Sequence, residues 1–191
     1  MKIRLKILLC LAIILAIWTF AGTIYTEMKT ILFLTNIVEL NKDFARDIRK
    51  WSRYYKNDWM WITSITLTET WGEKEVDSPL GKSRGAGAFQ LSLNVIHDAV
   101  ECHTWLKGRS HYDYELQAVG ANLHIRSLKD HFVDKHKPRY VRRVDAAQIY
   151  NIGIGDWWKG KRNPRYARKQ AKNYSWLKFE WRRYIRNPFK Y

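Results

Sequence analysis

The sequence has little that would support a disulfide, a metal centre or a phosphate-binding loop. Its only two cysteines are Cys10, inside an apolar run, and Cys102, far beyond it, so we expect no disulfide between them and no redox chemistry. The glycine-rich segment 81–87 lacks the Lys-Ser/Thr ending and the preceding strand of a phosphate-binding loop. We therefore predict no cofactor and no metal. The six histidines show no spacing typical of zinc motifs and are expected on the solvated surface: His97, His103, His111, His124, His131 and His136.

Acidic residues are also scarce, with 18 Asp and Glu against 34 Lys and Arg and a formal charge of +16. Such an excess predicts an anionic partner, for which nucleic acid, anionic lipid and cell-wall polymers all qualify. Ten Trp and eleven Tyr suit stacking on sugars or bases and also suit membrane interfaces. The 191 residues leave room for one targeting segment and one domain of roughly 150 residues.

The longest apolar run, residues 7–25, carries no charge over 19 positions. A helix needs about 20 such residues to cross the hydrocarbon core of a bilayer. Lys2, Arg4 and Lys6 precede the run, which predicts a cytoplasmic N-terminus and a domain on the far side of the membrane. A cleaved signal peptide is the alternative, but its apolar region is usually shorter and ends in an A-x-A-like site. We expect an uncleaved anchor in the cytoplasmic membrane, with the domain on the periplasmic or extracytoplasmic side.

Beyond residue 25, strand signals are sparse and the apolar periodicity predicts a mainly α domain. The expected helices cover residues 31–48, 58–70, 93–101, 116–132 and 145–150. Asp58 is a capping-type residue at the start of the second of these, and Glu69 lies near its end. Because Ile62 and Ile65 stand seven and four positions before Glu69, this carboxyl group falls on the apolar face of its helix.

Burial of Glu69 would have a chemical consequence. Desolvation disfavours the charged carboxylate and raises its pKa. A carboxylic acid that is still protonated near neutral pH can donate a proton to the leaving oxygen of a glycosidic bond. The alternative is that Glu69 is a surface glutamate in a salt bridge. The choice between a catalytic and a structural glutamate therefore depends on the flanking segments.

Three short segments occur in a fixed order: Glu69-Thr70, GAFQ at 87–90, and YNIGIG at 150–155. Together they resemble the lytic transglycosylase family with the soluble lytic transglycosylase (SLT, goose-lysozyme-like) fold, over about residues 58–157. The resemblance implies a lysozyme-like helical domain that cleaves peptidoglycan glycan strands. It implies Glu69 as catalytic acid and base, and as substrate-binding residues Thr70, Gly87, Phe89, Gln90, Tyr150 and Asn151.

The resemblance also implies individual roles. Gln90 would line the substrate cleft, and Phe89 would supply an apolar wall near the acid. The Tyr150 hydroxyl could hydrogen-bond Glu69 and hold its orientation. Since 21 positions separate Glu69 from Gln90, we expect an enlarged loop between them.

Two reaction outcomes and one non-enzymatic function remain open. In the transglycosylase route, Glu69 protonates the glycosidic oxygen and then deprotonates the muramic acid 6-hydroxyl, which attacks its own C1 to give a 1,6-anhydro sugar. A hydrolytic lysozyme of the same fold would instead use water, with a possible second carboxylate. A non-catalytic, membrane-anchored protein that binds DNA or wall polymer is the third possibility. The candidates for a second carboxylate are Glu73, Glu75, Asp77 and Asp98.

The chain is expected to divide into an anchor (1–25), a helical connector that packs on the domain (26–57), a catalytic core (58–157) and a basic aromatic helical extension (158–191). From residue 156 to 191 there are twelve Lys or Arg and two acids, interleaved with aromatic residues. This segment is either a contact surface for anionic polymer or lipid, or a closing helix whose aromatics pack on the core. We expect no specific nucleic acid.

Overall fold

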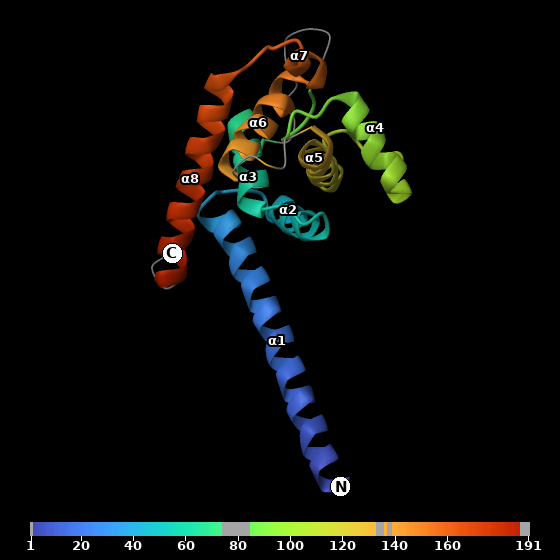
Figure 1. Ribbon diagram of the computed structural model, residues 1–191, viewed down its shortest axis with the longest axis vertical. Helices are drawn as coiled ribbons and strands as arrows, with labels where there is room; N and C mark the ends of the chain where they lie inside the picture. Colours follow the sequence, from blue (N-terminus) through green and yellow to red (C-terminus); the bar gives the residue numbers. More distant parts are fainter. Residues whose placement is uncertain (1, 74–84, 133–135, 137–138, 188–191) are drawn as a thin grey trace.

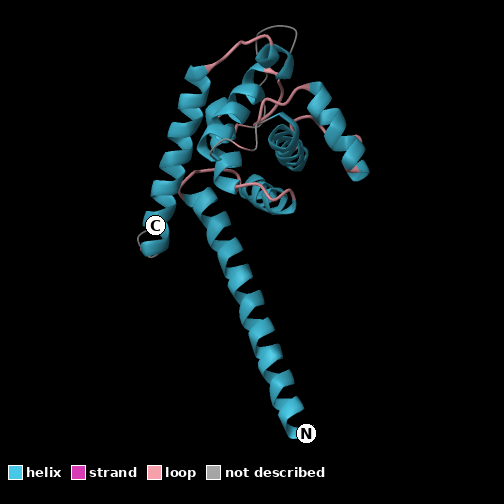
Figure 2. Cartoon of the chain, viewed as in Figure 1, coloured by secondary structure: helices cyan, strands magenta, loops and turns pink. Residues whose placement is uncertain are grey.

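A computed structural model describes residues 2–73, 85–132, 136 and 139–187 of the chain. Within these residues the backbone is almost entirely helical (Figure 2), and the only β-type pairing is an isolated bridge between Ala86 and Leu91. The mainly α class is confirmed, whereas the lysozyme-like architecture stays a prediction. The expected loop enlargement falls at 74–84, outside the described residues, as do the candidate carboxylates Glu75 and Asp77.

Helix α1 (Lys2–Asn36) is one continuous helix whose N-terminal part projects as a rod from the rest of the molecule (Figure 1). Its apolar side chains from Leu11 to Tyr25 are largely exposed, and the stretch Cys10–Asn36 is long and apolar enough to cross a membrane by length and composition. Past residue 25 the same helix enters the domain and buries Phe33 and Leu34. Anchor and connector are therefore joined without a break.

The single helix expected over residues 31–48 is wrong. Helix α1 ends at Asn36, and helix α2 (Lys42–Tyr54) begins after a turn in which Glu39 has a φ of 61°. The Asn41 side chain caps α2, because its oxygen accepts a hydrogen bond from the Asp43 amide at 2.9 Å, a role for which asparagine is well suited. The break turns α2 so that Phe44 and other apolar residues pack against the helix that follows residue 113.

Helix α3 (Trp59–Glu69) is the central element, and almost all of its side chains are buried. Asp58 caps it as predicted, since its carboxylate accepts a hydrogen bond from the Met60 amide at 3.1 Å. Helix α8 (Pro164–Arg186) runs beside α3 (Figure 1) and buries Leu177 and Tyr184 in the core. The segment expected as an extension thus packs as a closing helix, which is the second of its two interpretations.

The remaining elements complete the body around α3. Helix α4 (Leu93–Cys102) confirms the helix predicted at 93–101 and leads into a short 3-10 turn, η1 (Thr104–Leu106). Helix α5 (Tyr114–Ser127) ends in a π turn, η2 (Leu128–Phe132), so the helix predicted at 116–132 is present with an altered last turn. Helix α6 (Arg139–Ile152) extends the one predicted at 145–150, and the glycines after it lead into the short helix α7 (Ile154–Trp158).

Candidate functional site

Glu69 is the last residue of α3 and is mostly buried, while part of its surface stays accessible. Its Oε1 accepts a hydrogen bond from the Tyr166 hydroxyl at 2.6 Å. Desolvation by burial raises the pKa of Glu69 above its ordinary value, and the Tyr166 hydrogen bond and the Lys169 ammonium offset part of this rise. The expected combination of a buried helix end and an acid with a raised pKa is present.

The partner of Glu69 differs from the expected one. The Tyr150 hydroxyl donates its hydrogen bond to the carbonyl oxygen of Phe89 at 2.6 Å, so its donor is directed to the backbone and not to the carboxyl group. Tyr150 still lies within electrostatic reach, because Glu69 contributes to raising the pKa of Tyr150 well above its ordinary value, after burial itself. Tyr166, 97 positions away in sequence, holds the carboxyl group instead.

Tyr166 belongs to a stripe of polar residues on α8 that faces α3. Lys169 Nζ donates to the Thr68 carbonyl at 2.5 Å, Gln170 Nε2 to Ser64 Oγ at 2.6 Å, and Asn173 Nδ2 to Thr68 Oγ1 at 3.0 Å. Positions 166, 169, 170 and 173 recur at helical spacing. That spacing is the signal in the sequence from which Tyr166 could have been found.

Two threonine hydroxyls hydrogen-bond the GAFQ segment to the end of α3. The hydroxyl of Thr66 and the hydroxyl of Thr70 both donate to the Ala88 carbonyl, at 2.8 and 2.9 Å. Thr70 was expected among the substrate-binding residues. In the structure its hydroxyl holds the GAFQ backbone beside Glu69, a positioning role.

Within the GAFQ segment the backbone makes a tight turn. Gly87 has a φ of 73° and Gln90 a φ of 51°, and the Gln90 amide Nε2 donates to the Gly87 carbonyl at 3.0 Å. A side chain on Gly87 would meet the Gln117 amide at 2.6 Å, so glycine is required here both by conformation and by space. The Phe89 ring is fully buried and packs edge-on against Phe44. The ring thus lies in the core, while the Phe89 carbonyl accepts the hydrogen bond from Tyr150, and its role as an apolar wall near the acid stays a prediction.

Gln117 of α5 is a supporting residue that the sequence reasoning missed. Its Oε1 accepts from the Phe89 amide at 3.0 Å, and its Nε2 donates to the carbonyls of Ala86 and His111 at 2.9 and 2.7 Å. One fully buried side chain thus satisfies three backbone groups of two loops. Nothing in the local pattern around Gln117 distinguishes it from other polar residues.

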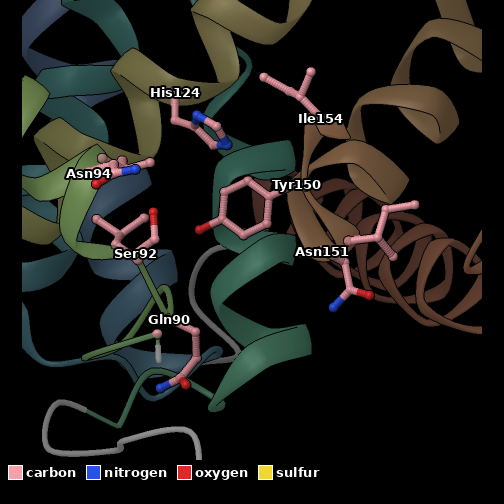
Figure 3. Close-up of a pocket in the computed structure, with 12 residues that line it drawn as sticks. Gln90, Ser92, Asn94, His124, Tyr150, Asn151 and Ile154 are labelled. Atoms are coloured by element: carbon pink, nitrogen blue, oxygen red, sulfur yellow. The ribbon is translucent and has the colours of Figure 1, made fainter. Parts of the chain in front are cut away.

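A cavity of about 330 Å³ opens beside the GAFQ turn. Figure 3 shows Tyr150 at its centre, with Gln90 on one side and Asn151 on another. Gln90, Tyr150 and Asn151 line it, whereas Glu69 is not among its lining residues, so their substrate-binding role stays a prediction. Tyr150 therefore lines the cavity and also lies within electrostatic reach of the acid.

His124 also lines this cavity, with its ring centroid 5.5 Å from that of Tyr150. Burial lowers the pKa of His124 to about 4, so this imidazole is neutral at physiological pH. His103 is buried and forms a 2.6 Å hydrogen bond with the Tyr55 hydroxyl. For His103 the expected surface location is wrong, whereas His124 is half-buried and borders the cavity.

Asn151 connects the cavity to the start of α8. Its Oδ1 accepts a hydrogen bond from Asn163 Nδ2 at 2.6 Å, and Asn163 in turn caps α8 by accepting from the Tyr166 amide at 3.0 Å. The YNIGIG segment thereby fixes where α8 begins. It is linked to Glu69 through Asn163 and Tyr166.

Trp71 is a further feature near the acid. It lies two residues after Glu69, is 54% exposed, and has a φ of 59°. A bulky residue in the left-handed region is uncommon and is retained where its surroundings fix it. The indole is inclined toward Trp176, with ring centroids 6.3 Å apart. This accessible indole, two positions after Glu69 in the sequence, is an aromatic surface on which a sugar ring could stack.

For a metal ion, the described residues offer one group: His97, Asp98 and Glu101 on α4, whose possible ligand atoms lie within 4.8 Å of one another. All three side chains are exposed, and the pair His97–Glu101 is explained by an ion-pair contact at 3.6 Å. This cluster contributes nothing to the chemistry at Glu69.

Neither models of known protein families nor curated proteins show a match to this sequence.

Proposed function

We propose that this protein is a membrane-anchored lytic transglycosylase that cleaves the MurNAc-GlcNAc β-1,4 bond of peptidoglycan. The observation that carries the proposal is the state of Glu69, a mostly buried, partly accessible carboxyl group with a raised pKa and a hydrogen bond from Tyr166. Such a group stays protonated at a higher pH than an ordinary glutamate, and glycosidic bond cleavage needs an acid of that kind.

The surroundings of Glu69 suit a sugar polymer. Trp71 offers an exposed aromatic face, and Gln90 and Asn151 bring amide groups to the neighbouring cavity. Flat rings stack on sugar faces, while amides hydrogen-bond hydroxyl and acetamido groups. These features favour a glycan over a purely apolar ligand.

In the proposed reaction one carboxyl group performs both proton transfers. Glu69 protonates the glycosidic oxygen as the bond to C1 breaks, and the resulting carboxylate takes the proton of the muramic acid 6-hydroxyl, whose oxygen bonds to C1. Glu69 ends protonated, and no water is consumed. Within the described part of the chain no carboxylate is among the groups that shift the pKa of Glu69, and Glu73 and Asp98 are exposed, while Glu75 and Asp77 lie outside that part. This arrangement favours the single-glutamate route over one that needs a second carboxylate.

Membrane anchoring is the second part of the proposal. Helix α1 supplies a span of suitable length, and Lys2, Arg4 and Lys6 before it favour a cytoplasmic N-terminus. The domain would then act on the wall from the outer face of the cytoplasmic membrane.

The test is mass spectrometry of the soluble fragments released when the purified chain acts on peptidoglycan sacculi. Fragments that end in 1,6-anhydro-muramic acid are the expected result. Fragments with reducing ends would show that the protein is a hydrolase that uses the same acid. The absence of fragments would refute the enzymatic proposal.

Replacement of Tyr166 by Phe is expected to lower the rate of cleavage about tenfold, the effect of losing one hydrogen bond to a charged group. Because the Tyr166 hydroxyl stabilises the carboxylate, its removal raises the pKa of Glu69 further. The acid then stays protonated to a higher pH, so the alkaline limb of the pH-rate profile should move up. Tyr174→Phe is the matched control, since that hydroxyl donates to Asp58 at 2.8 Å and its loss should leave the limb in place. A limb that stays or moves down in Tyr166→Phe would contradict the assignment.

Replacement of Trp71 by Ala is expected to raise the KM for glycan strands about threefold to tenfold, which is the worth of one aromatic stacking contact, and to change kcat little. Steady-state release of fragments from soluble glycan chains measures both constants. Trp105→Ala removes a comparably exposed indole from η1 and serves as the control. A fall in kcat with unchanged KM would assign Trp71 to the geometry of Glu69 and not to substrate binding.

A further inference from the structure

A second cavity, of about 220 Å³, lies where α1 enters the domain. It is lined by Glu27 and Ile31 of α1 and by Arg46, Arg49, Lys50 and Arg53 of α2. None of these residues takes part in the site around Glu69. The cavity is therefore a separate feature with its own chemistry.

Four cations and one carboxylate face this cavity. Arg53 forms an ion pair with Glu27, and Lys50 forms one with Glu115 at 2.6 Å. Arg49 differs, because its Nε is buried and has no hydrogen-bond partner within the described residues. A buried guanidinium nitrogen without a partner destabilises the protein, and an anion that accepts a hydrogen bond from it would remove that cost.

The position of the cavity along α1 indicates the source of that anion. Glu27 and Ile31, the α1 residues that line the cavity, follow the apolar run 7–25 by two and six residues, which is about 3 and 9 Å of helix beyond its end. The polar headgroup layer extends roughly 5–8 Å beyond the hydrocarbon core on each side of a bilayer. Tyr25, Met28 and Leu32 keep the adjoining surface of α1 apolar and 45–59% exposed, as a helix leaving the membrane would require. The cavity thus falls at headgroup depth, and this holds for either orientation of the span.

We infer that this cavity binds the phosphodiester headgroup of an anionic phospholipid, with Arg49 and Arg53 as its principal ligands. Arginine is suited to the task because its planar guanidinium meets two phosphate oxygens at once. The inference rests on the membrane insertion of α1 proposed above and on no step of the cleavage reaction. Bound lipid would fix α2, and with it the domain, against the membrane surface.

The test uses the full chain purified in detergent and native mass spectrometry with added lipid. Phosphatidylglycerol, phosphatidylcholine and phosphatidylethanolamine are titrated separately, and inorganic phosphate is added in a fourth series. We expect phosphatidylglycerol to bind at least fivefold more tightly than either zwitterionic lipid, with no displacement by millimolar phosphate. Equal binding of the three lipids, or full displacement by phosphate, would overturn the inference.

Variants locate the site. The double change Arg49→Gln with Arg53→Gln should weaken phosphatidylglycerol binding about tenfold, whereas Lys107→Gln with Lys159→Gln removes the same charge from exposed positions outside the cavity and should leave it unchanged. Glu27→Gln removes the one carboxylate among the described lining residues and should strengthen binding, which keeps the test decisive if the double variant fails to fold. Unchanged or weaker binding in Glu27→Gln would count against the site.

Carbonate extraction of membranes separates failure of the lipid site from failure of the membrane insertion proposed for α1. A chain that carbonate releases from the membrane is not inserted, which refutes insertion itself.

Discussion

Replacement of Glu69 by Gln is expected to lower the rate of peptidoglycan cleavage by about a thousandfold, within the range that general acid-base catalysis contributes. The amide keeps the size of the side chain and can still accept from the Tyr166 hydroxyl, which lies 2.6 Å from Oε1 in the native protein. It has no acidic proton to give to the glycosidic oxygen and cannot remove one from the 6-hydroxyl. Release of muropeptides from labelled sacculi measures the loss, and sedimentation with sacculi should show that binding survives.

The matched control for this change is Glu73→Gln, four positions further along and exposed. It makes the same chemical substitution in the same part of the chain, and cleavage should stay within about twofold, as is usual for surface changes. Glu69→Gln with near-native cleavage would remove the catalytic assignment. A loss of equal size in both variants would point to a structural effect of this loop and not to proton transfer.

The sequence predicts a helix well where its apolar residues recur at helical spacing along one face. It does not reveal the end of a helix where the following turn is itself apolar. Helix α4 was placed within one residue because its apolar positions stop at Cys102. The break between α1 and α2 was missed because Val38 and Leu40 are buried in the turn itself, at 2% and 5% exposure, and continue the apolar pattern across it. Only Asn41 marks the new helix, and one capping residue is a weak signal by itself.

The candidate site likewise has features that local sequence predicts and features that it does not. Local sequence could indicate Glu69, because its burial follows from its helix face, and could indicate Gly87, because its positive φ belongs to a tight turn. It could not assign the hydrogen bond to Glu69, which depends on how α8 returns across α3. It also could not predict the orientation of the Phe89 side chain, whose ring packs in the core against Phe44, 45 positions away in sequence. Contacts between residues far apart in sequence depend on how the helices pack, and they cannot be inferred from the local pattern of a single sequence.

Replacement of Gln117 by Leu is expected to lower the free energy of unfolding by about 3 kcal/mol, because it leaves buried backbone groups of both adjoining loops without partners at roughly 1–3 kcal/mol each. The native amide accepts from the Phe89 N–H and donates to the Ala86 and His111 carbonyls, and leucine offers neither function. Thermal unfolding of the full chain in detergent, followed by circular dichroism, measures the loss.

A second variant tests the direction of these hydrogen bonds. Gln117→Glu keeps an acceptor for the Phe89 amide but turns oxygen atoms toward the two carbonyls that now receive N–H groups, so it should destabilise the protein as well. Glu101→Leu, an exposed polar-to-leucine change on α4, should alter stability by no more than about 0.5 kcal/mol. If Gln117→Leu unfolds like the native chain, the GAFQ turn is held by the hydroxyls of Thr66, Thr70 and Tyr150 alone, which all reach its backbone carbonyls. Loss of stability together with loss of cleavage would instead show that this buried amide holds the GAFQ turn, and with it Gln90, in the conformation that cleavage requires.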